Sequence, residues 1–568
     1  MRLIHSKTLQ FHEFEQSSSG VPPYAILSHT WGDEEVTFRH MSSGPTATCS
    51  WKKGFAKITE TCRLAQEHNL DYVWIDTCCI DKSSSAELSE SSSAELSESS
   101  SAELSESSSA ELSESINSMF KWYENAAVCY VFLSDYVSGG TNFESCRWWS
   151  RGWTLQELLA PPKHIFYDAL WESVGTKLSL LWQISSITGI EEEVLRDKSQ
   201  IPLRSVSQRM AWAAFRQTTR MEDEAYCLLG IFGIYLPLLY GEGRMAFRRL
   251  QEEIIKRNAD LTIFFWDARR SGIEEPQYIS LFAESPKAFG MVKPITSITS
   301  GFPEFFITNK GVFFSVAFYL PPVIRSKGKG YLYYYFLGCD SNNLPVGILL
   351  RKIGPGIFCR ANHYLEKKYS VGPKTNNNGF YIITDPGPNI EAQMIQFRQL
   401  AFHLPDNGPP GCQFQLMRTV PSHLWDATDR VFLRAPESVA QWRLGSEYYS
   451  VIVAMIIKVH FTLDFDVDLI VLCEDDVTFV NKLKIFEAEK NPEVIESLFG
   501  ETNRETSVPS SEFRKVMANT ASLGNRVEIC LQPSNQRALV SLSIRPGTLQ
   551  VMSKEISVSD FALELVML

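Results

Sequence analysis

One glutamate has the surroundings that a catalytic carboxylate needs. Apolar spacing predicts a helix over residues 153–160, ended by the two prolines that follow. Its inward face consists of leucines: Leu155, Leu158 and Leu159. Glu157 and Trp153 share the opposite, solvated face. A carboxylate beside an aromatic ring can stabilise a developing cation or position an attacking water, so Glu157 is the candidate catalytic residue.

A structural role for Glu157 is an equal alternative. A carboxylate on a solvated helix face needs no catalytic purpose. Arg147 and Arg151 are near enough in the chain to pair with it. The residue types alone leave both roles open.

Five further residues are candidates for binding a substrate: Ser28, His29, Trp31, Asp76 and Trp153. Asp76 could bind a hydroxyl group or a cation. Each type also has a structural alternative, because strand-end histidines make structural hydrogen bonds, aspartates cap helices and tryptophans anchor packing. A nucleophilic pair of Cys78 and His29 lacks an activating pattern, so we interpret the cysteines as inert core thiols.

Alternating strands and helices must position these residues. Four runs of strand length are rich in β-branched or aromatic residues: 24–31, 72–79, 127–134 and 164–167. Helical spacing separates them over 55–65 and 116–123. This order predicts an α/β domain with a parallel sheet covered on both faces and a ligand site beyond the carboxyl ends of the strands. The polar residues expected at that edge are Ser28, His29, Asp76, Thr77, Ser134, Asp135 and Asp168.

Composition excludes several classes of protein. The 568 residues are 44% hydrophobic and 21% charged, as in soluble globular proteins. The net charge is -12, and the basic residues are scattered among acids, so we expect no nucleic-acid binding. The start of the chain lacks a secretory signal, and the apolar run 451–457 is too short to span a bilayer. We expect a cytoplasmic protein without a transmembrane segment.

The cysteines give no sign of a metal site. Twelve cysteines are spread along the chain without any C-x-x-C pair. In a reducing compartment they are interpreted as buried thiols. We therefore expect neither a metal nor a bound cofactor.

One segment is of low complexity. The unit Ser-Ser-Ser-Ala-Glu-Leu-Ser-Glu occurs four times in tandem over residues 83–114. Eight residues advance a helix by about 80° beyond two turns, so its leucines cannot form one apolar stripe. We interpret the repeat as an expanded loop whose last copy can cap the following helix. A phosphorylatable or partner-binding segment is the alternative.

The remaining chain changes character near residue 290. Residues 205–257 have a helical pattern with charges of both signs. Later runs of Val, Ile, Phe and Tyr alternate with Pro, Gly and Asn clusters, which predicts an antiparallel β-rich region of one or two domains, with a sandwich as one topology. We place a first domain at 1–265, a linker at 266–290 and the β-rich region at 291–568.

Five ordered blocks resemble a known domain family. Residues 25–36 read Ala-Ile-Leu-Ser-His-Thr-Trp-Gly-Asp-Glu-Glu-Val, and 73–82 read Val-Trp-Ile-Asp-Thr-Cys-Cys-Ile-Asp-Lys. Residues 151–161 read Arg-Gly-Trp-Thr-Leu-Gln-Glu-Leu-Leu-Ala-Pro, and further blocks follow at 218–231 and 239–243. In order and spacing they are similar to the signatures of fungal heterokaryon-incompatibility (HET) domains. The resemblance implies a role in non-self recognition, in which the activated domain triggers death of incompatible fused cells.

HET domains in turn resemble TIR domains, which have a flavodoxin-like fold. Residues 153–158, Trp-Thr-Leu-Gln-Glu-Leu, are similar to the TIR motif Trp-Cys-x-x-Glu-Leu, whose glutamate is catalytic in enzymes that hydrolyse NAD. Thr154 replaces the cysteine, but the carboxylate is kept. The resemblance implies NAD as a substrate, with Glu157 acting on the oxocarbenium-like ribose or on the attacking water.

The resemblance also bears on partners. The chain lacks the Gly-x-x-x-x-Gly-Lys-Ser/Thr motif of the nucleotide-binding modules in some larger relatives, so activation must come by another route. We expect self-association through the HET domain and an activating protein partner. The alternative to an enzyme is a non-enzymatic module that acts by self-association or by recruiting a partner.

Overall fold

The structure is a computed structural model of the chain. Its internal contacts divide the chain into two compact units, Met1–Ser271 with Phe282–Ser297, and Gly272–Leu281 with Ile298–Leu568. The structure describes residues 1–15, 20–42, 50–81, 101–139, 143–267, 278–290, 295–297, 304–315, 317–318, 322–324, 331–361, 375–376, 379–399, 401–404, 412–420, 422–427, 429–433, 451–461, 465–475, 481–499, 526–531, 536–551 and 554–567.

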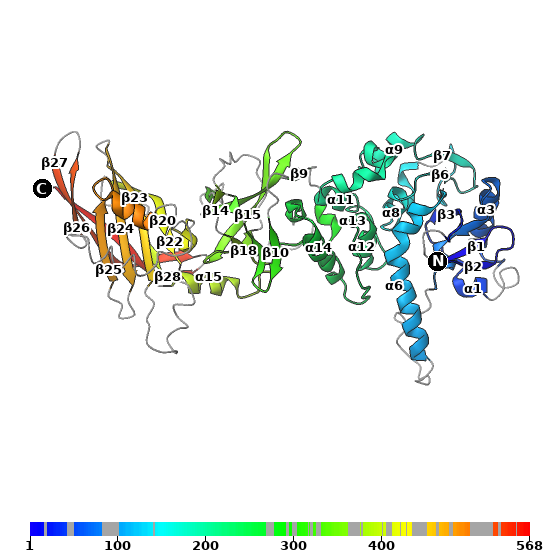
Figure 1. The fold of residues 1–568 in the computed structure, drawn as a ribbon, viewed down its shortest axis with the longest axis horizontal. Helices are drawn as coiled ribbons and strands as arrows, with labels where there is room; N and C mark the ends of the chain where they lie inside the picture. The colour runs from blue at the N-terminus through cyan, green and yellow to red at the C-terminus, as the bar shows by residue number, and fades with distance from the viewer. Residues whose placement is uncertain are drawn as a thin grey trace. The chain divides into compact units, whose positions relative to one another are not determined.

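The first unit is built on a seven-stranded sheet in the order β2-β1-β4-β3-β5-β6-β7. Figure 1 labels β1, β2, β3, β6 and β7 of this sheet near the N-terminus. The strands of the sheet are β1 (Arg2–His5), β2 (Phe11–Glu13), β3 (Tyr24–His29), β4 (Tyr72–Trp74), β5 (Val128–Phe132), β6 (His164–Tyr167) and β7 (Ser173–Thr176). β3 is parallel to β4 and β5, and β5 is parallel to β6. The α/β class and the four expected strands are confirmed. Every residue of β3 and β5 is buried, as expected for central strands of a covered sheet.

Two features of the sheet differ from the prediction. The sheet is mixed rather than parallel, because β1, β2 and β7 join its edges in antiparallel pairs. The second predicted strand ends at Trp74, and helix α4 (Asp76–Cys79) follows it. The run 72–79 therefore spans a strand and a helix, which a short apolar run cannot distinguish.

Two longer helices occupy the predicted crossovers. They are α3 (Lys53–Glu67) and α6 (Ser101–Asn125), and α3 buries Ile58, Cys62 and Ala65. Helix α6 corrects the interpretation of the repeat, because its fourth copy, 107–114, is itself helical rather than a cap. Leu112 of that copy is buried, and its packing stabilises a helical segment that the composition of the repeat does not predict. Residues 82–100 lie outside the described residues.

The other elements of the first unit are short, apart from α14. They are α1 (Phe38–Ser42), η1 (Phe143–Ser145), α7 (Arg147–Ser150), α8 (Thr154–Leu159), α9 (Leu181–Thr188), α10 (Glu192–Arg196), η2 (Lys198–Leu203), α11 (Val206–Ala211), α12 (Asp223–Tyr226), α13 (Leu229–Phe232), α14 (Met245–Arg257), η3 (Leu261–Phe264), η5 (Pro286–Phe289) and β9 (Ile295–Ser297). Helix α13 packs closely on α6, since a Cβ at Gly230 would lie 2.3 Å from the Cβ of Phe120.

The second unit is β-rich, as predicted. One sheet runs β10-β11-β18-β16-β15-β14-β13, with β8 paired to β16. These strands and the β12–β17 pair are β8 (Tyr278–Ile279), β10 (Phe305–Thr308), β11 (Gly311–Phe314), β12 (Ala317–Phe318), β13 (Pro322–Ile324), β14 (Tyr331–Asp340), β15 (Pro345–Gly354), β16 (Ile357–Ala361), β17 (Thr375–Asn376) and β18 (Phe380–Ile382). Helix α15 (Ile390–Arg398) follows and packs on β15.

Two further sheets of this unit pack face to face as a sandwich (Figure 1, yellow to red). The six-stranded sheet contains β21 (Trp425–Asp426), β22 (Val431–Phe432), β19 (Phe402–His403), β28 (Lys554–Met567), β27 (Gln536–Val551) and β26 (Arg526–Leu531). The four-stranded sheet contains β20 (Cys412–Val420), β23 (Val451–Phe461), β24 (Phe465–Asp475) and β25 (Asn481–Glu487). Helix α17 (Pro492–Phe499) covers the outer face of the smaller sheet, and η6 (Ser422–Leu424) precedes β21.

A buried ion cluster links the sandwich to the first sheet within this unit. The fully buried side chain of Arg398 pairs with Asp426 and, over 2.5 Å, with Asp429. Arg351 of β15 reaches the same Asp429 oxygen over 2.5 Å. Arg398 also donates to the backbone carbonyls of Lys352 and Ile353 in β15 and of Met394 in α15. Such charges are tolerated in a core only because they are paired and hydrogen-bonded.

Candidate active site

The structure brings Glu157 and Ser28 into direct contact. Ser28 precedes the last residue of β3, and its hydroxyl donates to Oε2 of Glu157 over 2.5 Å. The indole Nε1–H of Trp148, in α7, donates to Ser28 Oγ over 2.8 Å. All three side chains are buried. These bonds tie the helix that carries Glu157 to the carboxyl end of a central strand.

Burial sets the ionisation of Glu157. The residue is only 7% exposed, and burial raises the pKa of its carboxyl to about 8. Hydrogen bonds with Ser28 and Tyr123 and the charge of Arg216 oppose this rise, whereas the charge of Asp76 adds to it. The carboxyl is therefore mostly protonated at neutral pH.

This burial overturns the position expected for Glu157. The prediction placed Glu157 and Trp153 on a solvated face, with Arg147 or Arg151 as possible ion-pair partners. All of α8 is buried, because the short helix packs against α6, α7 and β3. The carboxyl contacts Ser28 instead of solvent. The expected end of the helix before the prolines is confirmed.

Asp76, the first residue of α4, holds two other candidate residues. Its Oδ1 lies 3.0 Å from Nε2 of His29, and its Oδ2 accepts from Nε1 of Trp31 over 2.9 Å. Lys57 Nζ lies 3.0 Å from Nδ1 of His29 and also pairs with Glu35. Because an ammonium group only donates, Nδ1 is the acceptor and Nε2 carries the proton of neutral His29. Both nitrogens of His29 are thus engaged in positioning.

Asp76 and the two residues it holds, His29 and Trp31, lie next to the contact between Ser28 and Glu157. Ser28 and His29 are consecutive residues, and the charge of Asp76 acts on the pKa of Glu157. Five of the six predicted site residues are therefore brought together. The sixth, Trp153, is half-buried and hydrogen-bonds Asp223 of α12, where it helps to offset the effect of burial on the pKa of that aspartate.

Sequence reasoning missed three residues that contact this group. Tyr123 of α6 is fully buried and donates to the Leu27 carbonyl over 3.1 Å. Trp148 of α7 is fully buried and donates to Ser28 Oγ. Arg216 donates to Thr154 Oγ1 over 2.9 Å at the start of α8. The available signal was a polar group on an otherwise apolar face, as for Tyr123 in the helical stripe 116–123.

The other polar residues expected at this edge have structural partners. Asp168 accepts the backbone N–H groups of Leu170 and Glu172 in its own loop and that of Ser138 in the loop after β5, at 2.9 to 3.0 Å. Asp135 accepts the backbone N–H of Arg147 over 2.8 Å, at the start of α7. Ser134 Oγ lies 3.3 Å from Thr30 Oγ1. Thr77 is buried within α4.

The surroundings of Cys78 do not activate it as a nucleophile. Cys78 and Cys79 are free thiols buried in α4. Burial raises the pKa of Cys78 well above its usual range, which keeps the thiol protonated. Since His29 is engaged on both nitrogens, it provides no base for Cys78.

Within the described ranges, no group of three or more His, Cys, Asp or Glu residues is placed to hold a metal ion. No helix in the part of the chain that the structure describes is both long and apolar enough to cross a bilayer.

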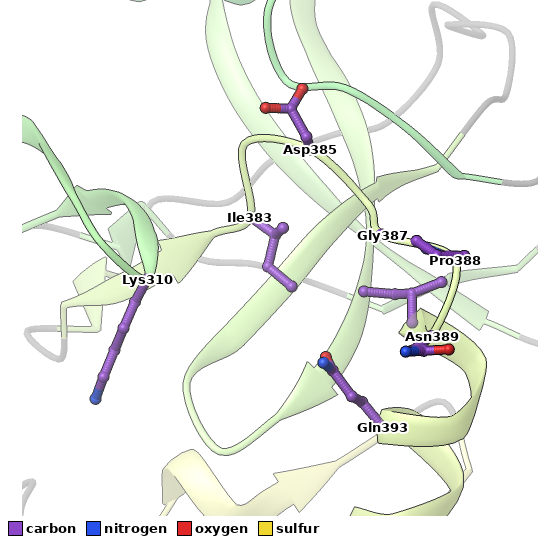
Figure 2. A pocket seen from close by; sticks show the side chains of 8 residues that line it. Lys310, Ile383, Asp385, Gly387, Pro388, Asn389 and Gln393 are labelled. Atoms are coloured by element: carbon purple, nitrogen blue, oxygen red, sulfur yellow. The ribbon is translucent and has the colours of Figure 1, made fainter.

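The second unit contains a separate cavity of about 300 Å³ at the start of α15. Lys310, Ile383, Asn389 and Gln393 are among its lining residues, and Figure 2 shows the Asp385 carboxylate pointing away from Ile383 and Gln393. None of the predicted site residues lines it.

Comparisons with known proteins find similarity over the part of the chain that contains the candidate site. Residues 24–157 match the family described as heterokaryon incompatibility protein (HET), and residues 245–285 match a domain of unknown function (DUF8212). The chain is 41% identical over 262 residues to vegetative incompatibility protein HET-E-1 of Podospora anserina. The aligned part covers 43% of this chain and only 17% of that protein, and no solved structure matches the chain. The range 24–157 runs from the start of β3 to Glu157, so the part of the chain that is similar to the heterokaryon-incompatibility (HET) family contains the contact between Ser28 and Glu157.

Proposed function

We propose that this HET domain is an effector of heterokaryon, or vegetative, incompatibility that causes regulated cell death by hydrolysing NAD. The family match and the similarity to HET-E-1 support the incompatibility role. One observation carries the enzymatic part: Glu157 is fixed by Ser28 at the carboxyl end of β3, beside the Asp76–Trp31 pair.

The topology favours a ligand site at this place. In chain order the four parallel strands are arranged 2-1-3-4, the order of doubly wound flavodoxin-like sheets, to which TIR domains belong. The chain passes from β3 to β4 on one side of β3 and then crosses to β5 on the other side. Ligands of such sheets bind outside the carboxyl ends of the strands at this switch point. Ser28 and His29 end β3 there.

The reaction would break the bond between the nicotinamide nitrogen and C1′ of the ribose. Nicotinamide leaves as a neutral base with the bonding electrons, water adds to C1′, and one proton is released. Positive charge develops on the ribose in the transition state, and an ionised Glu157 would stabilise it and orient the water. A cationic nicotinamide ring beside Glu157 lowers the pKa of the carboxyl, so substrate binding itself favours the ionised form.

Two neighbouring side chains supply substrate contacts in this proposal. Trp31 keeps 45% of its surface exposed although its indole N–H is fixed by Asp76. A held but exposed ring can stack against a planar base. The Asp76 carboxylate can accept from a ribose hydroxyl, and His29 holds it in place.

The burial of Glu157 favours a second candidate function. A carboxyl that is 7% exposed reaches a substrate only after a local opening. In the non-enzymatic candidate the domain acts by self-association or by recruiting a death-pathway partner, and Glu157 is structural. In the enzymatic one, self-association or an activating protein opens the site.

Expression in yeast distinguishes the two. Cells producing the full chain, Glu157→Gln or the exposed control Glu172→Gln would be followed for viability and NAD content. We expect NAD to be depleted before viability falls in cells that produce wild type or the control. Cells that produce Glu157→Gln at the same protein level should keep both their NAD and their viability. Equal killing by all three without NAD loss would support the non-enzymatic module.

A further inference from the structure

Two buried titratable residues beneath α8 have no part in the proposed chemistry. His164, the first residue of β6, is 2% exposed, and Lys177, directly after β7, is 7% exposed. Their backbones are hydrogen-bonded, since Lys177 N donates to the His164 carbonyl over 3.3 Å. Isolated buried residues of these types are costly and call for a physical reason.

The reason begins with the two prolines that end α8. In an α-helix each carbonyl accepts from the N–H four residues later. The carbonyl of Gln156 does so, from Ala160 N over 2.9 Å. The next two carbonyls, of Glu157 and Leu158, would need donors at 161 and 162, where proline has no N–H. The catalytic candidate itself therefore has a backbone acceptor without a helical partner.

His164 and Lys177 supply those two missing donors. His164 Nε2 lies 2.9 Å from the Glu157 carbonyl oxygen, and Lys177 Nζ donates to the Leu158 carbonyl over 3.3 Å. Lys177 Nζ also donates to the Pro161 carbonyl over 3.3 Å. A cation at the carboxyl end of a helix is further favoured by the helix dipole.

The groups that face this pair fix its charge state. Burial, and next the charge of Lys177, hold the pKa of His164 well below its usual range, so the ring is neutral. Burial lowers the pKa of Lys177 to about 8, with Cys129 of β5 opposing this and Lys198 of η2 adding to it. Among the described residues, buried Nδ1 of His164 has no hydrogen-bond partner, consistent with the proton on Nε2.

We propose that His164 and Lys177 are positioning residues for Glu157. They cap α8 by donating to the two carbonyls that lack helical donors because of Pro161 and Pro162. In this way they hold the Glu157 backbone in the position where its carboxyl contacts Ser28. The effect on catalysis rests on the proposed function, whereas the effect on α8 does not.

A matched pair of variants tests this for His164. The amide nitrogen of His164→Gln takes the place of Nε2 and can still donate to the Glu157 carbonyl. His164→Asn places it where Nδ1 lies, short of that carbonyl. We expect His164→Asn to lower kcat for NAD by about tenfold to a hundredfold with KM nearly unchanged, and His164→Gln to restore most of kcat.

Lys177→Met tests the second cap, with the exposed Lys163→Met as its control. Loss of kcat at nearly constant KM is expected for Lys177→Met alone. If the His164 variants fail to fold by circular dichroism, this pair decides the proposal. An active wild type whose Lys177→Met and His164→Asn variants keep full kcat would overturn the positioning role and leave the proposed function intact.

Hydrogen–deuterium exchange of the full chain separates the two claims. Amides of residues 154–160 should exchange faster in His164→Asn and Lys177→Met than in His164→Gln and Lys163→Met, with β3 and β5 unchanged. If wild type does not turn over NAD, the proposed function fails, yet this exchange pattern still supports the caps. Equal exchange in all four variants would overturn them.

Discussion

Ser28 donates a hydrogen bond to Glu157 over 2.5 Å although 129 residues separate them in the chain. The bond joins β3 to α8, and Trp148 fixes the Ser28 hydroxyl from the other side. Because all three groups are buried, they depend on one another for their hydrogen bonds. The hydrogen-bonded chain from Trp148 through Ser28 to Glu157, called the relay below, positions the carboxyl for the proposed chemistry.

Removing the Ser28 hydroxyl should destabilise the fold. Ser28→Ala leaves the Trp148 N–H and a carboxyl oxygen of Glu157 without their partner. We expect the free energy of unfolding to fall by about 1–3 kcal/mol, measured by urea denaturation. Ser173→Ala, on the exposed strand β7, should stay within about 0.5 kcal/mol of wild type. Equal stability of the two variants would show that the relay contributes nothing.

The buried Glu157 carboxyl predicts an unusual dependence of stability on pH. Between its ordinary pKa of 4.5 and the raised value of about 8, the folded chain keeps a proton that the unfolded chain has lost. The folded state then binds more protons, so its stability falls as pH rises, by up to about 1.4 kcal/mol per pH unit. Glu157→Gln removes this loss.

The stability of Glu157→Gln relative to wild type should therefore increase steadily across that pH range and level off above it. Taking the difference between the two proteins cancels the contributions of His164 and Lys177. Unfolding curves recorded at several pH values measure it. Parallel pH profiles of the two proteins would contradict the raised pKa.

The pH dependence of activity follows from the same group. The profile of kcat/KM reports ionisation of groups in the free enzyme. If the ionised carboxyl of Glu157 is the active form, kcat/KM for NAD should rise with pH as Glu157 ionises and level off above about 8. At saturating NAD the kcat profile should be shifted to lower pH, because the cationic ring favours ionisation. Identical kcat and kcat/KM profiles would exclude this coupling.

Trp31 should determine affinity more than rate. Removing its exposed ring in Trp31→Ala is expected to raise KM for NAD about tenfold, equivalent to about 1.4 kcal/mol, with a smaller change in kcat. Trp51→Ala, which removes a tryptophan that is 71% exposed, serves as the control. An unchanged KM in Trp31→Ala would remove Trp31 from the substrate site.

Arg398 should be essential for the second unit. Arg398→Met removes the ion pair that Arg398 makes with the buried Asp426, which is 0% exposed. We expect a loss of about 3–5 kcal/mol in the free energy of unfolding. Arg430→Met, which alters a half-buried arginine of the neighbouring turn, is the comparison. Similar small losses for both would show that the cluster is only marginally stabilising.

The strands and crossover helices of the first unit were predictable because each is an apolar run or stripe. β3, β5 and β6 lie where the runs 24–31, 127–134 and 164–167 predict them. The edge strands β1, β2 and β7 were not predictable, since each has at most four residues, no residue of β2 or β7 is buried, and β1 buries only Leu3 and Ile4. The helical fourth copy of the repeat depends on tertiary packing of Leu112, which composition does not reveal.

The types of the site residues were predictable, but their environment was not. Glu157 occupies a position that helical periodicity assigns to solvent, yet it is buried because Ser28, from a distant strand, meets it. His164 and Lys177 are near in sequence to the carbonyls they contact, which the prolines after α8 leave without helical donors. The prolines predict that the helix ends, but they do not specify which side chains supply the missing donors.

The most direct test of the account is product analysis with the purified full chain at high concentration. Wild type and Glu172→Gln are predicted to convert NAD to equal amounts of nicotinamide and ADP-ribose, whereas folded Glu157→Gln should form neither. Turnover by Glu157→Gln at the wild-type rate, or none by any of the three when all are folded and self-associated, would contradict a catalytic Glu157.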